Sequence, residues 1–191
     1  MGKYIIIYLF LFLNSEFIIG QNNTDSLGQK QGRWMFFSEY DTLIGCEAYT
    51  FCTYVNGIME GSLQVLDNKE NIRYEVQIVN GKRTGIANLF DAKHRLVATF
   101  NFEKEELRSI IRFWKNGKIY QIIELKNGIP HGSKITFRNK GKMWNQISYQ
   151  NGKLNGHYKN YYRNGHIRTD ELYKDDELTK LKVYYRNGKL K

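Results

Sequence analysis

Apolar and polar residues alternate along most of the chain, and short polar turn sequences interrupt the alternation at regular intervals. Residues 150–165 show the pattern, because Asn-Gly pairs flank a run rich in tyrosine. Asn-Gly is the strongest short signal for a β-hairpin, since a type I′ turn needs a positive φ at both central residues. The chain holds eight such pairs. Strict alternation between turns predicts antiparallel strands with one face differing from the other.

The turns recur with a fixed period. When the second glycine of each Asn-Gly-x-x-x-Gly stretch is the anchor, Gly61, Gly85, Gly132 and Gly156 follow at intervals of 24, 47 and 24 residues. The interval of 47 contains one degenerate unit, for which Ser109 is the expected anchor. Lys180 is the expected anchor of a second degenerate unit, and Gly32 begins the series 29 residues before Gly61. An internal repeat of this length indicates a repeat architecture.

Other positions follow the same register. Large residues stand five places after each anchor: Phe37, Leu66, Phe90, Trp114, Phe137, Tyr161 and Tyr185. A first series of large residues lies two places before each Asn-Gly turn or its equivalent: Tyr54, Ile78, Phe102, Leu125, Tyr149 and Tyr173. A second series lies two places earlier again: Val76, Phe100, Ile123 and Ile147. Residues at spacing 2 share one face of a strand. Glu171 breaks the second series, and a bulge after Asn164-Gly165 is expected to account for it.

These patterns predict an all-β fold, an elongated antiparallel β-meander of about seven 24-residue repeats of two strands each. Repeats need contact only their neighbours, so a solenoid-like single sheet can extend beyond the usual strand number. Aromatic residues make up 15% of the chain and Pro130 is the one proline, which suits strands that need their N–H donors. The structural turn glycines are expected at Gly57, Gly61, Gly81, Gly85, Gly128, Gly132, Gly152 and Gly156.

Several stretches resemble known repeats. Tyr-Tyr-Arg-Asn-Gly-His/Lys at 161–166 and 184–189, Asn-Gly-Lys-Arg-Thr-Gly ending at Gly85, and Gly-Lys-Leu-Asn-Gly ending at Gly156 are similar to MORN-repeat variants. The resemblance covers about residues 29–191. It extends to a bacterial family of toxin–antitoxin system antitoxins built of these repeats. It implies a β-repeat fold and, as a function, neutralisation of a toxin by direct binding.

The first twenty residues differ from the repeats. Lys3 precedes ten uncharged, mostly apolar residues, and a short polar stretch follows. This order is typical of a secretory signal peptide, and ten residues are too few to span a bilayer as a helix. We expect a signal peptide at 1–20 with cleavage near Gly20–Gln21, a flexible lead-in at 21–31 and a β-repeat domain at 32–191. The alternative is a buried or membrane-anchoring N-terminal helix.

Charge is distributed unevenly after residue 20. Residues 21–102 hold eight Lys/Arg and nine Asp/Glu, whereas residues 103–191 hold twenty and nine. Within 107–168, thirteen Lys/Arg stand against Glu124 alone. A solvated sheet face that avoids aggregation is one interpretation, and an anionic partner is the other. For the second, a binding stripe is expected from Lys134, Arg138, Lys142, Lys159 and Arg163.

No pattern in the chain predicts catalysis, a metal site or a cofactor. The four histidines do not form a His-Glu-x-x-His motif, and the Asp175-Asp176-Glu177 cluster falls in a turn. Cys46 and Cys52 are six residues apart, which favours two free thiols on one strand face over a disulfide that would need a turn between them. The chain is therefore expected not to be an enzyme.

Together these observations favour an exported, non-enzymatic repeat protein that acts as a binding scaffold, located in the periplasm, cell envelope or extracellular space. Its expected partner is a protein or an anionic envelope component, with a membrane surface as a further candidate. Nucleic acid is not expected to be the partner of an exported protein. The alternative function is that of an antitoxin or immunity protein that binds a toxin directly.

Overall fold

The computed structural model describes residues 22–191, so the predicted signal peptide lies outside the described residues. Residues 22–191 form strands, turns and loops, with no helix among them. The chain divides into two compact units, unit 1 ending at Glu105 and unit 2 running from Glu106 to Lys191.

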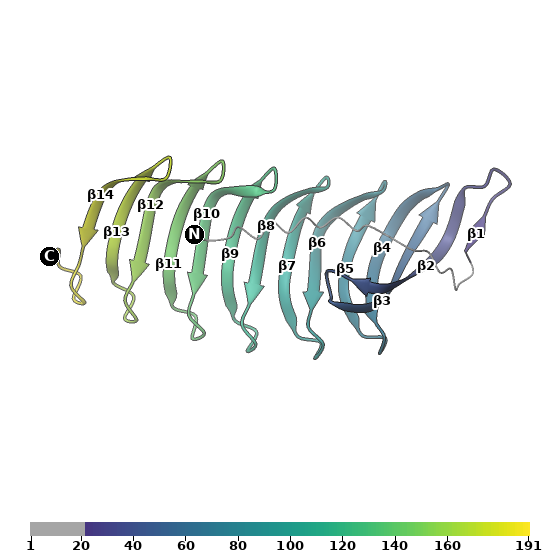
Figure 1. The fold of residues 1–191 in the computed structure, drawn as a ribbon, viewed down its shortest axis with the longest axis horizontal. Coiled ribbons are helices and arrows are strands. Elements are labelled where there is room, and N and C mark those ends of the chain that lie inside the picture. The colour runs from purple at the N-terminus through teal and green to yellow at the C-terminus, as the bar shows by residue number, and fades with distance from the viewer. Residues whose placement is uncertain (1–21) are drawn as a thin grey trace. The chain divides into compact units, whose positions relative to one another are not determined.

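In both units each strand pairs antiparallel with the next strand along the chain (Figure 1). The predicted all-β antiparallel meander is therefore confirmed. The strands of unit 1 are β1 (Asn23–Thr24), β2 (Lys30–Asp41), β3 (Cys46–Val55), β4 (Ile58–Asp67), β5 (Ile72–Val79), β6 (Lys82–Phe90) and β7 (Leu96–Glu103). Those of unit 2 are β8 (Glu106–Phe113), β9 (Ile119–Lys126), β10 (Ile129–Phe137), β11 (Met143–Gln150), β12 (Lys153–Tyr161), β13 (Ile167–Lys174) and β14 (Glu177–Val183).

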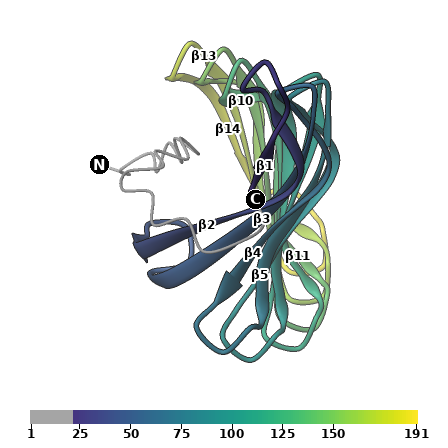
Figure 2. The ribbon, with the colours of Figure 1, turned by 90° about the vertical axis from the view of Figure 1, so that its right-hand side faces the viewer.

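Two kinds of turn join the strands and occupy opposite strand ends (Figure 2). The short turns have two central residues, both with positive φ, as a type I′ turn requires. Asn151 and Gly152, for example, have φ of 50° and 82°. The structure places Gly57, Gly81, Gly128 and Gly152 in these short turns. Asp175 and Asp176 adopt the same conformation without glycine.

The anchor glycines Gly61, Gly85, Gly132 and Gly156 lie inside strands instead of turns. Each has a positive φ and lies at a shift in the strand register. Between β11 and β12, for example, three residues of β12 face Ser148 alone. This bulge needs a backbone conformation that glycine adopts without steric cost. The Asn-Gly pair at Asn155-Gly156 therefore makes a bulge where the sequence suggests a turn.

The expected anchors Ser109 and Lys180 are each displaced by one residue. Ile110 and Lys134 both pair with Ile123, so Arg108 corresponds to Gly132. In β14, Thr179 is the extra residue opposite the Leu172–Tyr173 step. Both repeats lack the anchor glycine and are one residue shorter than the 24-residue period. Phe113 and Tyr184 therefore occupy the position in their repeats that Phe137 occupies in its own repeat. Trp114 and Tyr185, which the sequence predicted there, do not.

The expected bulge near Glu171 is present but does not explain that residue. Arg168 is the extra residue between the pairs Asn160–Thr169 and Tyr161–Ile167. The same shift precedes Phe137 and Phe113 in their repeats, so it is a general feature. Glu171 keeps its place on the strand face and accepts hydrogen bonds from the hydroxyls of Thr169 and Tyr173.

The beginning of the described chain differs from the flexible lead-in expected at 21–31. Asn23 and Thr24 pair with Gln31 and Lys30, and the Asp25 carboxylate accepts N–H groups within the connecting turn. Cys46 and Cys52 both lie on β3, and both are free thiols. The expectation of two unbonded thiols on one strand is confirmed. Burial raises the pKa of the Cys52 thiol, which favours its protonated form.

The apolar core lies mainly in unit 1. The buried apolar residues there come from one strand face: Trp34, Phe36, Ala48, Cys52, Leu63, Val65, Tyr74, Val76, Ile78, Ala87, Ala98, Phe100 and Phe102. In unit 2 only Ile110 and Ile147 are buried to the same degree among apolar side chains. Burial raises the pKa of Tyr74, a residue at the centre of the unit 1 core, to about 12.

Candidate functional site

Four five-residue loops lie at one end of the unit 2 strands and form the candidate site. They comprise residues 114–118, 138–142, 162–166 and 185–189, here called the loop row. The main chain closes each loop in the same way: the N–H of Trp114 donates to Lys118 O at 2.8 Å, and that of Gly117 to Trp114 O at 2.9 Å. The same pair of bonds closes the other three loops. The fourth loop follows β14 and is completed by the bridge between Tyr184 and Leu190.

Side chains fasten each loop to the next one. Trp114 Nε1 donates to Phe137 O at 3.2 Å, and a guanidinium nitrogen of Arg138 donates to Tyr161 O at 3.0 Å. The Tyr162 hydroxyl donates to Tyr184 O at 2.9 Å, so the contact repeats with a separation of 22 or 23 residues. Asn116 and Asn164 add parallel bonds to Asn139 O and Arg186 O. These bonds hold the loops in one line.

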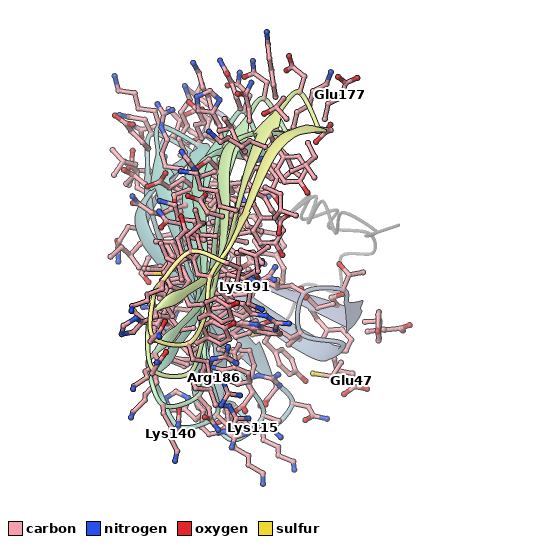
Figure 3. The ribbon with its side chains drawn as sticks, turned by 90° about the vertical axis from the view of Figure 1, so that its left-hand side faces the viewer. Glu47, Lys115, Lys140, Glu177, Arg186 and Lys191 are labelled. Atoms are coloured by element: carbon pink, nitrogen blue, oxygen red, sulfur yellow. The ribbon has the colours of Figure 1, made fainter. Side chains whose placement is uncertain are left out.

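The loop row is strongly cationic. It contains eight Lys/Arg and no Asp or Glu: Lys115, Lys118, Arg138, Lys140, Lys142, Arg163, Arg186 and Lys189. All are exposed except Arg138, which is half-buried with its guanidinium 5.5 Å from the centre of the Trp144 ring. Lys115, Lys140 and Arg186 lie at the same end of the strands in Figure 3, and Glu177 lies at the other end.

Acidic residues of unit 2 form hydrogen bonds and an ion pair with groups outside the loop row. Glu124 accepts the N–H of Ser133 at 2.6 Å, and Asp176 accepts that of Leu154 at 2.7 Å. Asp170 lies 2.6 Å from Nδ1 of His157. Among residues 106–191, no ion pair joins a carboxylate to a cation of the loop row. The row therefore presents a positive field to solvent without internal neutralisation.

The corresponding loops of unit 1 are built differently. They begin with Asp41, Asp67 and Asp91, whose carboxylates accept N–H groups of their own loops. A hydrogen bond from the Arg95 side chain lowers the pKa of Asp91 to about 2. These three loops hold four acidic and three basic residues, so they lack the charge of the loop row. The cationic row is a property of unit 2 and not of the repeat itself.

The predicted basic stripe does not form one surface. Lys134 lies on β10 in a row with Ile123 and Ile147. Lys159 lies on β12 opposite Gln146, one position from the Ile147–Tyr158 pair, so its side chain points to the other face. Burial, and then the neighbouring Arg112 charge, lowers the pKa of Lys134. Only three of the five predicted residues, Arg138, Lys142 and Arg163, belong to the loop row.

Sequence reasoning missed Lys115, Lys118, Lys140, Arg186 and Lys189. The signal was available in the repeated five-residue stretches Trp-Lys-Asn-Gly-Lys, Tyr-Arg-Asn-Gly-His and Tyr-Arg-Asn-Gly-Lys. Their shared spacing places a cation within two residues of the turn glycine in every loop. Because these loops alternate with short turns along the chain, all four loops lie at the same end of the strands.

Between residues 22 and 191, no group of three or more His, Cys, Asp or Glu is arranged to hold a metal ion. No helix long and apolar enough to cross a membrane occurs in that range.

The fold and the loop sequences agree with one family comparison. The matching family is described as MORN repeat variant, and the match covers residues 154–175, which include all of β13 and all of β12 except Lys153. This confirms the repeat resemblance for that stretch, whereas the antitoxin resemblance stays a prediction. Repeats of this kind generally mediate binding or interaction. A search of curated proteins found no match.

Among solved structures, the chain is similar to part of S. aureus TarM, crystallised in complex with Fondaparinux, alpha-GlcNAc-glycerol and UDP. The sequence identity is 22% and the TM-score 0.37, with 50% of this chain and 19% of that chain covered. At this TM-score the likeness is not evidence about the ligand of the present chain.

Proposed function

We propose that this protein is an exported, non-enzymatic binding scaffold and that its loop row binds an anionic partner. The observation that carries the proposal is the row of exposed, unneutralised cations at one edge of unit 2. Cations needed only for solubility would be expected in the corresponding loops of both units. Here the unit 1 loops, built on the same repeat, are nearly balanced in charge.

The chemistry of the row is suited to recognition. Lysine and arginine pair with phosphate, sulfate or carboxylate groups, and their attraction extends over about 8 Å at physiological salt. The loops are held by main-chain and side-chain hydrogen bonds, so less conformational freedom is lost on binding. An envelope component that bears such groups is the partner class we favour.

The test compares the protein with a variant carrying Lys115→Glu, Lys140→Glu and Arg163→Glu. Both would be titrated against anionic vesicles, neutral vesicles and purified envelope polymer at low and high salt. We expect the unchanged protein to bind an anionic target, with affinity falling as salt rises, and the variant to lose binding. Binding that responds to neither salt nor charge reversal would contradict the proposal.

Export is a separate part of the proposal and has its own test. The charged, apolar and polar order of residues 1–20 supports it. N-terminal sequencing of the protein recovered from outside the cytoplasm should begin within a few residues of Gln21. An intact Met1 on soluble cytoplasmic protein would contradict export without bearing on the loop row.

The alternative is an antitoxin or immunity protein. Its support is the resemblance of the Tyr-Tyr-Arg-Asn-Gly stretches to the repeats of that family. Affinity capture followed by mass spectrometry separates the two. A single protein retained at high salt would favour the antitoxin, and release of the captured material by salt would favour the anionic partner.

A further inference from the structure

The geometry of the loop row specifies a ligand class more narrowly than charge alone. Successive loops are two strands apart, and neighbouring strands are spaced by about 4.8 Å, so the loops repeat at roughly 10 Å. Four loops therefore form a line of roughly 30 Å. Each contributes at least one exposed Lys or Arg, and three of the four contribute two.

Side-chain hydrogen bonds between successive loops hold this line of loops rigid. Five side-chain bonds between successive loops, among them Trp114 to Phe137 O and Asn164 to Arg186 O at 2.7 Å, fix the loop positions. A compact anion would meet the cations of one loop only. An extended chain could meet all four, and each further contact would be intramolecular once the first had formed.

We infer that the loop row binds a linear, flexible polyanion that carries no stacking bases, laid along the ends of the strands from loop to loop. This inference rests on the proposed function, because it requires that the row bind anions at all. Its new content is the extended form of the ligand and its direction, which runs from loop to loop across the strand ends.

Two other polyanionic partners fit the row less well. A bilayer surface offers a plane, whereas the cations form a line, and the loop tips are Asn-Gly or Lys-Gly without an apolar side chain to insert. Single-stranded nucleic acid favours free aromatic rings for stacking. Two rings of the row are already engaged: Trp114 packs edge-on against Tyr120 at 4.6 Å, and Arg186 lies over Tyr162 at 5.9 Å.

The test measures binding of pyrophosphate, tripolyphosphate and long-chain inorganic polyphosphate at equal phosphate concentration. We expect the affinity to rise by about 10²-fold or more from the shortest to a chain that spans the row, as for linked binding groups. Chains longer than the row should add little. Single-stranded DNA of equal charge serves as a competitor and is expected to compete less well than polyphosphate.

Two triple variants provide the matched comparison. The row variant carries Lys115→Gln, Lys140→Gln and Arg163→Gln, and the control carries Lys126→Gln, Lys153→Gln and Lys174→Gln at the opposite edge. Both lose three exposed cations. We expect the slope of log affinity against log salt to fall by about 2 in the row variant, at about 0.7 per contact. The control should keep the slope and the length dependence.

The outcomes separate the two proposals. Equal binding of short and long phosphates, or equal losses in both variants, would overturn the inference of an extended ligand while leaving anion binding intact. Stronger competition by DNA would overturn the ligand class. The absence of binding to every anionic probe would overturn the inference and the proposed function together.

Discussion

Single glycines decide where the strands of each repeat bulge. Gly132 and Gly156 have φ of 96° and 105°, beyond the left-handed region that asparagine tolerates. A Cβ at Gly156 would also meet the Cβ of Ser148 at 3.0 Å. Gly152 in the neighbouring short turn has a φ of 82° and open space around it. Two glycines four residues apart therefore have different requirements.

We predict that Gly156→Asn lowers the free energy of unfolding by about 2 kcal/mol or more, because it adds backbone strain and a close contact. Gly152→Asn should cost less than about 1 kcal/mol, since asparagine is the common non-glycine residue of such turns. Urea unfolding of both variants measures the difference. Equal losses would show that the bulge does not need glycine.

Lys134 is a lysine whose pKa is shifted by its surroundings. It is half-buried between Ile123 and Ile147, and burial, followed by the Arg112 charge, lowers its pKa. A lysine with a folded pKa below its unfolded value of about 10.4 destabilises the fold while it is charged. The cost is fully present below the folded pKa and is relieved as pH rises to the unfolded pKa.

We predict that Lys134→Met raises the free energy of unfolding at pH 7 by about 1 kcal/mol. This is about what half-burial of an apolar side chain contributes to stability. The difference between the two proteins should shrink as pH approaches the unfolded pKa. Lys142→Met, in an exposed loop position, should change stability little. A destabilised Lys134→Met variant would contradict this account of the β10 face.

At the level of elements, the loops of the two units are held by different means. In unit 1 an aspartate closes its own loop, whereas in unit 2 an aromatic or arginine side chain reaches the next loop. The Tyr162 hydroxyl contact to Tyr184 O holds the last loop of the row. Tyr185 occupies the equivalent position in that last loop and is 53% exposed.

We predict that Tyr162→Phe lowers the free energy of unfolding by about 1 kcal/mol, the usual value of a lost hydrogen bond. Amide exchange should speed up in residues 185–189, because their loop loses its fastening. Tyr185→Phe is the control and should do neither. Unchanged exchange in Tyr162→Phe would show that the loop is held without this bond.

The repeat, its antiparallel strands and the short turns follow from the sequence because Asn-Gly chemistry and the 24-residue period act locally. The anchors predicted at Ser109 and Lys180 were each wrong by one residue. A repeat that lacks the anchor glycine is also one residue shorter, which shifts the count by one. The prediction that the basic stripe forms one surface was wrong for a related reason. A shift of one residue reverses the strand face, as Lys134 and Lys159 show.

At the level of the whole molecule, the two units distribute burial differently. A cross-strand row of unit 1 contains Val65, Tyr74, Leu89 and Ala98. The row at the same repeat positions in unit 2 is polar up to its last member, and it runs through Arg112, Gln121, Thr136, Asn145, Asn160 and Thr169 to Val183. Its side chains bond to one another, as Asn160 Nδ2 does to Thr169 Oγ1 at 3.0 Å.

We predict that native-state amide exchange is slower in β4–β6 of unit 1 than in β11–β13 of unit 2, by about tenfold or more. Apolar burial is the main source of local stability, and thirteen of the fifteen buried apolar side chains among residues 22–191 lie in unit 1. Exchange followed by mass spectrometry on peptides of each unit would measure it. Equal protection would mean that the polar row stabilises unit 2 as well as an apolar row does.

The central claim is that the loop row is the binding edge, and NMR titration with long-chain polyphosphate tests it most directly. The amides of Gly117, Gly141, Gly165 and Gly188 report on the four loops, and those of Gly128 and Gly152 report on the opposite edge. We predict shift changes at the four loop glycines that saturate together and weaken with salt, with little change at the other two. Changes confined to Gly128 and Gly152, or spread evenly over all six, would contradict the claim.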